Sequence, residues 1–500
     1  MSLALVYARA SLGIDAPLVT VEVHLSNGLP SLSIVGLPET AVRESKDRVR
    51  SAIINSHLEF PARRITINLA PADLPKEGGR FDLAIALGIL AASEQIPASE
   101  LHQFECVGEL ALSGALRAVT AVLSAGLACG LAGRQLIVPQ ANSQEAGLCS
   151  GTTIYQANNL LSVCAHFHKR QTLPLCEEPT NEACVHPHNL SEVKGQEQAK
   201  RALTVAAAGQ HNLLFYGPPG TGKTMLAQCL PSILPSLSTE QALEVAAIHS
   251  MAGFEGLRAT CLPPFRSPHH TATAPAMVGG GARANPGEVS LAHHGVLFLD
   301  EFPEFQRRVL EVMREPLESG SVVISRANYK TRYPSNFQLI AAMNPCPCGY
   351  QGDVAKNCRC SPDQIRRYQD KISGPLLDRI DLQVQLMPLH RGELYDAATG
   401  ASSAETRGQV ELARRCQYKR QGLVNSQLDK ALLEEHCLLT SGQLELLENA
   451  ANKLGLSARA QHRVMKVART LADLEGVKRI SNPHLIEALG YRGLDCQSRY

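Results

Sequence analysis

One eight-residue stretch, Gly217-Pro-Pro-Gly-Thr-Gly-Lys-Thr224, constrains the fold more than any other part of the chain. It satisfies the pattern G-x-x-x-x-G-K-[S/T] in full, and it lies between an apolar run at 212–216 and a helix-like segment at 225–230. In a strand–loop–helix of this kind, glycines let backbone amides turn onto phosphate oxygens, and the helix N-terminus adds its dipole. The pattern therefore predicts an α/β domain with a nucleotide phosphate site. A glycine-rich turn without that function is the alternative, and the flanking strand and helix disfavour it.

Two acids at the end of a second apolar run, Gly295-Val-Leu-Phe-Leu-Asp-Glu301, add to this site. Asp300 is expected to hold magnesium together with the Thr224 hydroxyl, and Glu301 to polarise an attacking water. Lys223 would place its charge on the β- and γ-phosphates. A surface Asp–Glu pair is the alternative. The residues expected to bind ATP are Gly217, Pro218, Pro219, Gly220, Thr221, Gly222, Lys223, Thr224 and Asp300.

Two further polar residues complete the predicted nucleotide site. Asn344 ends the apolar run 339–343, where its amide could orient the water or sense the γ-phosphate. Arg379, in Leu376-Leu-Asp-Arg-Ile-Asp381, is a candidate arginine finger, a group that offsets transition-state charge and often comes from a neighbouring subunit. Taken alone, Arg379 would more often be an ion-pair partner of Asp378 or Asp381.

Four cysteines form a close pair of C-x-C motifs at Cys346, Cys348, Cys358 and Cys360. Four thiolates at this spacing can surround zinc tetrahedrally in a closed structural site. Unliganded buried cysteines are the alternative. The chain has 15 cysteines, an odd number scattered over a long sequence, which favours a reducing cytoplasmic location over a disulfide framework.

The sequence divides into three predicted domains. Its 500 residues suggest about three domains. Mixed strand and helix patterns predict an α/β or α+β domain over 1–169, and a proline-rich polar linker follows at 170–188. A second α/β pattern covers 189–390, and helical periodicity covers 391–500. No apolar run is long enough to cross a bilayer, so no membrane association is expected.

The formal net charge of +1 excludes a globally basic nucleic-acid coat but allows a local basic patch. The segment 320–333 reads as a β-hairpin with its turn near Ala327 and Asn328. Its basic residues Arg326, Lys330 and Arg332 could meet DNA phosphates. An ordinary solvated hairpin is an equally good interpretation. Aromatic residues make up only 4%, which weakens any model of base stacking.

The motifs together resemble the AAA+ ATPases, more closely their Mg-chelatase-like branch, and best of all the ComM/YifB family. The resemblance covers nearly the whole chain. Its most specific stretches are Phe265-Arg-Ser-Pro-His-His-Thr271, Gly279-Gly-Gly281, Pro286-Gly-Glu288, Asn344-Pro-Cys-Pro-Cys-Gly349, Ser373-Gly-Pro-Leu-Leu-Asp-Arg-Ile-Asp-Leu382 and Leu456-Ser-Ala-Arg-Ala460.

This resemblance implies a homo-hexameric ring with ATP sites between subunits. It implies Arg379 as the finger and Arg459 as a second sensor arginine from a C-terminal helical lid. Ring-pore insertions would lie at 265–288 and 320–333. The implied activity is that of a DNA helicase, which would use ATP and Mg²⁺ to drive branch migration on forked, three-stranded or single-stranded DNA during natural transformation.

The N-terminal segment resembles the proteolytic domain of Lon-type proteases. In Pro75-Lys-Glu-Gly-Gly-Arg-Phe81 the position similar to the catalytic serine holds Arg80, and no lysine lies between Lys76 and Lys169. A Ser–Lys mechanism therefore cannot operate. An ATP-dependent protease is thus disfavoured, whereas a chelatase-type motor that remodels a protein partner remains the alternative to a DNA helicase.

Overall fold

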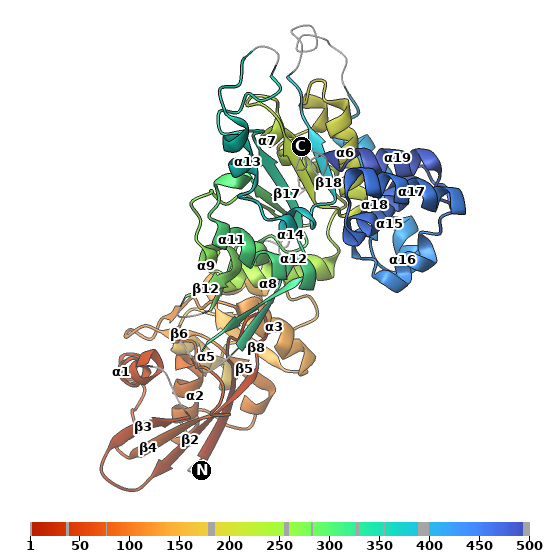
Figure 1. Cartoon of the computed structure of the whole chain (residues 1–500). Coiled ribbons are helices and arrows are strands. Elements are labelled where there is room, and N and C mark those ends of the chain that lie inside the picture. The colour runs from red at the N-terminus through yellow and green to blue at the C-terminus, as the bar shows by residue number, and fades with distance from the viewer. Residues whose placement is uncertain are drawn as a thin grey trace.

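The computed structural model arranges the chain as three successive units, with the N-terminal unit at one end, a central α/β unit at the other and the C-terminal helices beside that central unit (Figure 1). The structure describes residues 3–36, 40–76, 78–178, 186–254, 260–281, 284–326, 330–353, 356–388 and 400–493. Within these ranges, no helix is both long and apolar enough to cross a membrane.

A seven-stranded mixed sheet forms the N-terminal unit. Residues of β1 and β2 alternate between buried and more exposed positions, as expected for strands with one face on a core. The strands, in spatial order, are β3 (Ser31–Val35), β4 (Arg64–Ala70), β2 (Leu18–Ser26), β1 (Leu3–Arg9), β5 (Phe104–Cys106), β8 (Gln135–Pro139) and β9 (Ile154–Ala157). A separate two-stranded ribbon pairs β6 (Glu109–Leu110) with β7 (Leu116–Arg117).

The buried helix α2 (Asp82–Ala92) covers β1 and β2 of this sheet, and α1 (Thr40–Asn55) packs on α2. Gly88 allows the close approach, because a Cβ there would lie 2.5 Å from Cγ2 of Val23. The other helices of the unit are α3 (Val122–Leu131), α4 (Ser143–Ala146) and α5 (Leu160–Phe167).

The chain after α5 adds to the N-terminal unit before it leaves it. Leu173 is buried in the core of this unit, and Tyr155 of β9 bridges to Leu175. The linker expected at 170–188 therefore begins with residues that pack, because residues 174–176 make backbone hydrogen bonds to β9 next to the buried Leu173. Residues 179–185 of that expected linker lie outside the described residues.

The central unit is a five-stranded sheet in which every neighbouring pair is parallel. Leu213 and Phe215 of β10 face one core and Leu214 and Tyr216 face another, so helices or loops cover both sides. In spatial order the strands are β11 (Phe265–Arg266), β14 (Val296–Leu299), β17 (Gln338–Met343), β10 (Leu213–Tyr216) and β18 (Leu382–Gln385).

Helices of the central unit fall in three stretches of the chain. Those before β11 are α6 (Glu197–Gly209), α7 (Lys223–Ile233) and α8 (Thr239–Met251); those between β11 and β17 are α9 (Ala274–Val278), α10 (Glu288–Leu291), α11 (Arg307–Val312) and α12 (Arg314–Ser319); those before β18 are α13 (Pro362–Gln369) and α14 (Gly374–Leu377). The segment 265–288 is thus partly structured, and it includes the short pair β12 (Gly279–Gly280) and β13 (Asn285–Pro286).

The C-terminal unit is all-helical, and we call it the lid. Its helices are α15 (Ser403–Gln421), α16 (Lys430–His436), α17 (Ser441–Leu454), α18 (Ala458–Leu474) and α19 (Asn482–Gly490). α15 and α18 pack on α6, and α15 also packs on α7, so lid and central unit share one apolar core. The expected boundary at residues 390 and 391 lies outside the described residues.

The N-terminal and central units also share an apolar cluster. Ala246 and Ala247 of α8 pack with Val122 and Ala125 of α3. The Ser250 hydroxyl at the end of α8 donates to Glu145 of the N-terminal unit. The hairpin of β15 (Ser321–Ser325) and β16 (Lys330–Pro334) reaches from the central unit to the N-terminal one (Figure 1).

Candidate nucleotide site and cysteine cluster

The phosphate loop joins the carboxyl end of β10 to the start of α7, as the sequence predicts. Gly220 and Gly222 adopt φ angles of +79° and +88°, a backbone region that favours glycine. The buried Lys223 Nζ donates to the carbonyl oxygens of Gly217 and Pro218, both at 2.8 Å. Burial lowers the pKa of Lys223 to about 8, with the Asp300 carboxylate acting in the opposite direction.

Thr224, at the start of α7, and Asp300, directly after β14, meet at the carboxyl edge of the sheet. The Thr224 hydroxyl donates to Asp300 Oδ2 at 2.9 Å, and the backbone N–H of Glu301 donates to Asp300 Oδ1 at the same distance. A hydroxyl beside a carboxylate is an oxygen donor set that suits Mg²⁺. The two residues therefore fit the metal that a nucleotide would bring.

Glu301 lies beside His270, a residue to which the sequence motifs assign no chemical role. His270 Nδ1 is 3.0 Å from Glu301 Oε2. Glu301 also has a φ of +51°, an uncommon conformation that turns the chain sharply after β14. His270 belongs to the stretch 265–271, which resembles the family in sequence. Its position next to Glu301 follows only from the fold.

Asn344 follows β17, the strand between β10 and β14. Its Oδ1 accepts a hydrogen bond of 3.2 Å from Lys223 Nζ. The structure therefore brings Lys223, Asn344, Thr224 and Asp300 together at the carboxyl edge of the parallel sheet, where ligands of open α/β sheets bind.

Arg379 lies at the opposite edge of the same sheet. It follows α14 and precedes β18, and its carbonyl oxygen accepts from Asn212 Nδ2 at 2.9 Å, next to the start of β10. β10 has four residues, so the two edges are about 13 Å apart. The guanidinium pairs with Glu318 and donates from Nη1 to the Pro375 carbonyl at 2.6 Å. Asp378 and Asp381, the partners considered from sequence, are not the partners that the structure gives it.

Asp381 pairs with a lid arginine instead. Arg463 Nη1 lies 2.5 Å from Asp381 Oδ1, and His211 Nδ1 lies 3.4 Å from Asp381 Oδ2. Burial acts to raise the pKa of Asp381, but the charge of Arg463 and the His211 hydrogen bond outweigh it and hold that pKa below its usual range.

Arg459 is exposed in the first turn of α18, one turn before Arg463. Burial is the main cause of a lowered Arg379 pKa, and the charges of Arg314, Arg463 and Arg459 lower it further. Four arginines thus gather at the amino edge of the sheet. The family resemblance implies a role for Arg459, but the sequence does not predict that this residue lies near Arg379 and away from the phosphate loop of its own chain.

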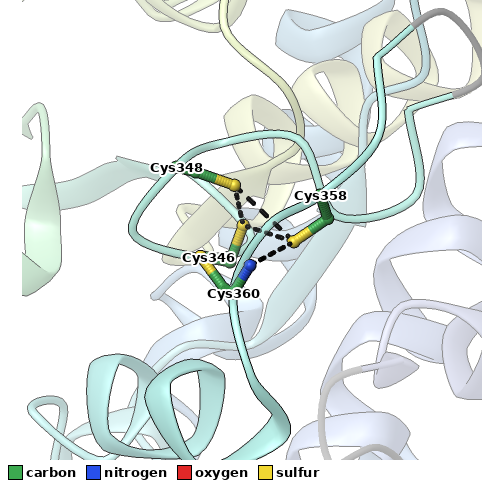
Figure 2. Close-up of side chains that lie close together, drawn as sticks. All are labelled: Cys346, Cys348, Cys358 and Cys360. Atoms are coloured by element: carbon green, nitrogen blue, oxygen red, sulfur yellow. Dashed lines mark hydrogen bonds between the residues drawn. The ribbon is translucent and has the colours of Figure 1, made fainter.

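The four cysteines of the C-x-C motifs lie together after β17 (Figure 2). The Sγ of Cys346 is 3.4 Å from that of Cys348 and 3.7 Å from that of Cys358, and all four sulfurs lie within 4.8 Å. Tetrahedral zinc with Zn–S bonds of about 2.3 Å requires sulfurs about 3.8 Å apart. The cluster therefore fits zinc.

The hairpin places two of its three basic residues on one exposed face. Lys330 pairs with Ser325 and Arg332 with Val323, so all four side chains share that face. The opposite face is buried and includes Thr331. Arg326 donates to the Gly281 carbonyl. The expected turn at Ala327 and Asn328 lies outside the described residues.

The protease-like stretch holds no serine where a protease would need one. Lys76 is buried, and its Nζ donates to the carbonyl oxygens of Gly36, at 2.9 Å, and Pro71. Burial lowers its pKa. Arg80 is also buried, while Glu77 lies outside the described residues.

A phosphate loop after β10, acids after β14 two strands away and a helical lid on the same core define a P-loop ATPase of the AAA class. Three family models agree in chain order: subunit ChlI of Mg-chelatase over residues 21–142, magnesium chelatase subunit ChlI over 189–394, and the ChlI C-terminal model over 400–492. The chain belongs to the ComM/YifB family within this class. It is 52% identical to competence protein ComM of Haemophilus influenzae, over 99% of this chain and 98% of that protein.

Two other relatives are similar to this chain, one over its full length and one over part of it. Protein YifB of Escherichia coli is 51% identical over 99% of this chain and 98% of its own length. The magnesium-chelatase 38 kDa subunit of Rhodobacter capsulatus is 23% identical over 59% of this chain and 83% of its own length.

Proposed function

We propose that this chain is an ATP-dependent DNA helicase or translocase that acts as a homo-hexamer and promotes branch migration while transforming DNA is integrated. The observation that carries the proposal is the full-length 52% identity to a competence protein. The nucleotide site supplies the physical basis, because every group that ATP hydrolysis needs in cis lies at one edge of the parallel sheet.

The chemistry assigned to this edge follows from the contacts. Lys223, already beside Asn344, would bind the β- and γ-phosphates. Thr224 and Asp300 would hold Mg²⁺, which neutralises phosphate charge when bound. Glu301 would take a proton from the attacking water, while His270 holds its carboxylate in place.

The proposed assembly follows from the position of the arginines. Arg379 lies at the amino edge, a strand length of about 13 Å from the phosphate loop of its own chain, and, beyond the effect of burial, Arg459 is near enough for its charge to lower the pKa of Arg379. They can stabilise transition-state charge only on a nucleotide held by another copy. This supports ATP sites built between subunits, with both arginines acting in trans.

The proposed DNA contact is the exposed hairpin face with Lys330 and Arg332. A chain with net charge +1 needs to concentrate its positive charge to bind DNA, and a ring repeats each hairpin around one axis. Phosphate contacts of this kind are independent of sequence, as a translocase requires. Arg326 would add to this face if it exchanged the Gly281 carbonyl for a phosphate.

The test measures whether DNA stimulates ATP hydrolysis by the full chain, and whether the chain displaces a strand from a forked or three-stranded substrate. Lys223→Ala serves as the inactive control. Stimulation and displacement by the wild type would support the proposal. ATP hydrolysis without any response to DNA would favour a motor that remodels a protein partner, to which the chelatase-subunit models are also suited.

A further inference from the structure

Arg379, the proposed finger, is held against its own chain. Only 7% of its side-chain surface is exposed, and its Nη1 donates to the Pro375 carbonyl oxygen at 2.6 Å. Its Nη2 donates to the Glu318 carboxylate. While these contacts hold, most of the guanidinium faces its own chain, and little of it is open to a nucleotide held by another copy.

The two contacts differ in the segments that they join. Pro375 lies four residues before Arg379, so this bond stays within one short segment. Glu318 belongs to α12, 61 positions away, and its side chain is 56% exposed. An ion pair with an exposed partner is weak. A movement of α12 relative to the Arg379 segment would therefore break the Glu318 contact at little cost.

The held position also leaves part of the guanidinium unsatisfied. Within the described residues, the buried Arg379 Nε has no hydrogen-bond partner. A buried N–H without an acceptor disfavours the conformation that contains it. Phosphate oxygens of a nucleotide on another copy could accept from this group. Glu318 therefore competes with that nucleotide for the same guanidinium.

Glu318 is joined directly to the hairpin proposed to contact DNA. α12 ends at Ser319, Gly320 follows with a φ of +64°, and β15 begins at Ser321. The Ser319 hydroxyl donates to the Ser321 carbonyl oxygen, and the Ser335 N–H donates to the Gly320 carbonyl oxygen, both at 2.8 Å. Both strands of the hairpin are thus tied to the end of α12, so a displacement of the hairpin acts on Glu318.

We infer that Glu318 is a positioning residue that holds Arg379 away from the neighbouring ATP site, and that DNA bound to the hairpin releases it. The inference rests on the proposed function and deepens it, because it names the contact through which DNA stimulates hydrolysis. Glu318 acts only through Arg379 and touches no nucleotide itself.

The first test compares Glu318→Gln with Glu315→Gln, a matched control that removes the same charge from an exposed residue of the same helix. We expect Glu318→Gln to raise kcat without DNA about fivefold, the upper end of what an ion pair with an exposed partner contributes. The DNA-saturated kcat should match the wild type, so the ratio of stimulated to basal kcat falls by the same factor. Glu315→Gln should keep both wild-type values.

Subunit mixing tests whether Glu318 acts through the arginine that it holds. In a mixture of Lys223→Ala and Arg379→Ala chains, each active interface joins the phosphate loop of an Arg379→Ala chain to the arginines of a Lys223→Ala chain. Glu318→Gln added to the Lys223→Ala chain should therefore raise the recovered rate. The same change added to the Arg379→Ala chain should leave that rate unchanged.

An arginine-specific reagent gives a readout that does not depend on activity. Without nucleotide, phenylglyoxal should modify Arg379 faster in Glu318→Gln than in the wild type, as measured by mass spectrometry of the peptide. The rate at Arg117, whose side chain is 65% exposed, should be the same in both. Forked DNA should speed up the modification of Arg379 in the wild type but not in Glu318→Gln.

The outcomes are distinct. A wild type whose ATP hydrolysis is absent or does not respond to DNA overturns the proposed function, and this inference with it. With a DNA-responsive wild type, the inference alone fails if Glu318→Gln keeps the wild-type ratio, or if its effect in the mixtures follows the Arg379→Ala chain. It fails equally if phenylglyoxal modifies Arg379 at the same rate in Glu318→Gln and Glu315→Gln.

Discussion

Thr331 of the hairpin lies directly against Gly13 of the N-terminal unit: a Cβ on Gly13 would be 2.7 Å from Thr331 Cγ2 and 3.3 Å from the Arg332 carbonyl oxygen. The proposed DNA contact is therefore the outer face of a hairpin whose inner face rests on another domain. This gives the N-terminal unit, which lacks the groups of a protease, a structural task in holding the hairpin.

Replacing Gly13 by alanine should displace the hairpin. Gly133→Ala is the matched control, because Gly133 has a similar φ (+67° against +61°) and nothing within 4 Å of an added Cβ. Both changes carry a backbone cost of about 1–2 kcal/mol, but only Gly13→Ala adds a steric clash. We expect a larger fall in Tm and weaker DNA binding for Gly13→Ala, measured by thermal unfolding and fluorescence anisotropy. Equal effects of the two variants would contradict the contact.

Glu301→Gln should bind ATP as the wild type does and hydrolyse it at least about 100-fold more slowly, because the general base is lost. Lys223→Ala should instead weaken nucleotide binding. Glu304→Gln is the control, since Glu304 lies three residues on and pairs with Lys371 at 3.1 Å. Steady-state kinetics and analogue binding distinguish the three variants. Wild-type kcat in Glu301→Gln would refute the assignment.

Arg379→Ala and Arg459→Ala should each reduce hydrolysis, the first by about 10³-fold. Mixing either variant with Lys223→Ala should restore activity, because about a quarter of randomly formed interfaces would join an intact phosphate loop to intact arginines. Mixing Arg379→Ala with Arg459→Ala should restore none, because no copy then carries both. Recovery of ATP hydrolysis in the mixture of Arg379→Ala and Arg459→Ala would show that the two arginines do not act on the same nucleotide from one subunit.

Lys330→Ala combined with Arg332→Ala should weaken DNA binding and lower the slope of log K against log salt by about two, one for each phosphate contact. Basal ATP hydrolysis should survive, because both residues lie outside the nucleotide site. Lys430→Ala removes an exposed charge from the lid and serves as the control. A double variant that binds and unwinds DNA normally at moderate salt excludes this face as the contact.

Arg463→Met should destabilise the joint between the lid and the central unit by about 3–5 kcal/mol at pH 7, because it leaves the buried Asp381 carboxylate without its main partner. The pairing holds the pKa of Asp381 below its unfolded value of about 3.9, so its stabilisation is present above that value and is lost as the pH falls through the folded pKa. In the variant, burial would raise the same pKa, and protonation would relieve the cost at mildly acidic pH. The difference in the free energy of unfolding between wild type and variant, measured with urea, should therefore be smaller at pH 4.5 than at pH 7. An equal difference at both pH values would argue against the Arg463–Asp381 ion pair.

The sequence predicted those parts of the molecule that neighbouring residues determine. The phosphate loop is flanked by its own strand and helix, and the strands that end at Asp300 and Asn344 are apolar runs, so their placement at one sheet edge follows from parallel pairing. The cysteine loop has its four ligands within 15 residues, and their spacing was enough to predict their proximity.

Contacts between distant segments gave no local signal. Glu318 pairs with Arg379 across 61 positions, and Thr331 meets Gly13 across the domain boundary. The position of Arg459 depends on how the lid packs on α6, which no periodicity within α18 reveals.

The separation of the phosphate loop and the arginines onto opposite edges gives each chain a direction. When copies join so that one edge meets the next copy's opposite edge, every copy donates arginines to one neighbour and receives them from the other. The two neighbours of any copy are then chemically different, one upstream and one downstream. A change in the nucleotide bound by one copy is sensed directly on one side only, so a ring of such chains has a built-in sense of circulation before any DNA enters it.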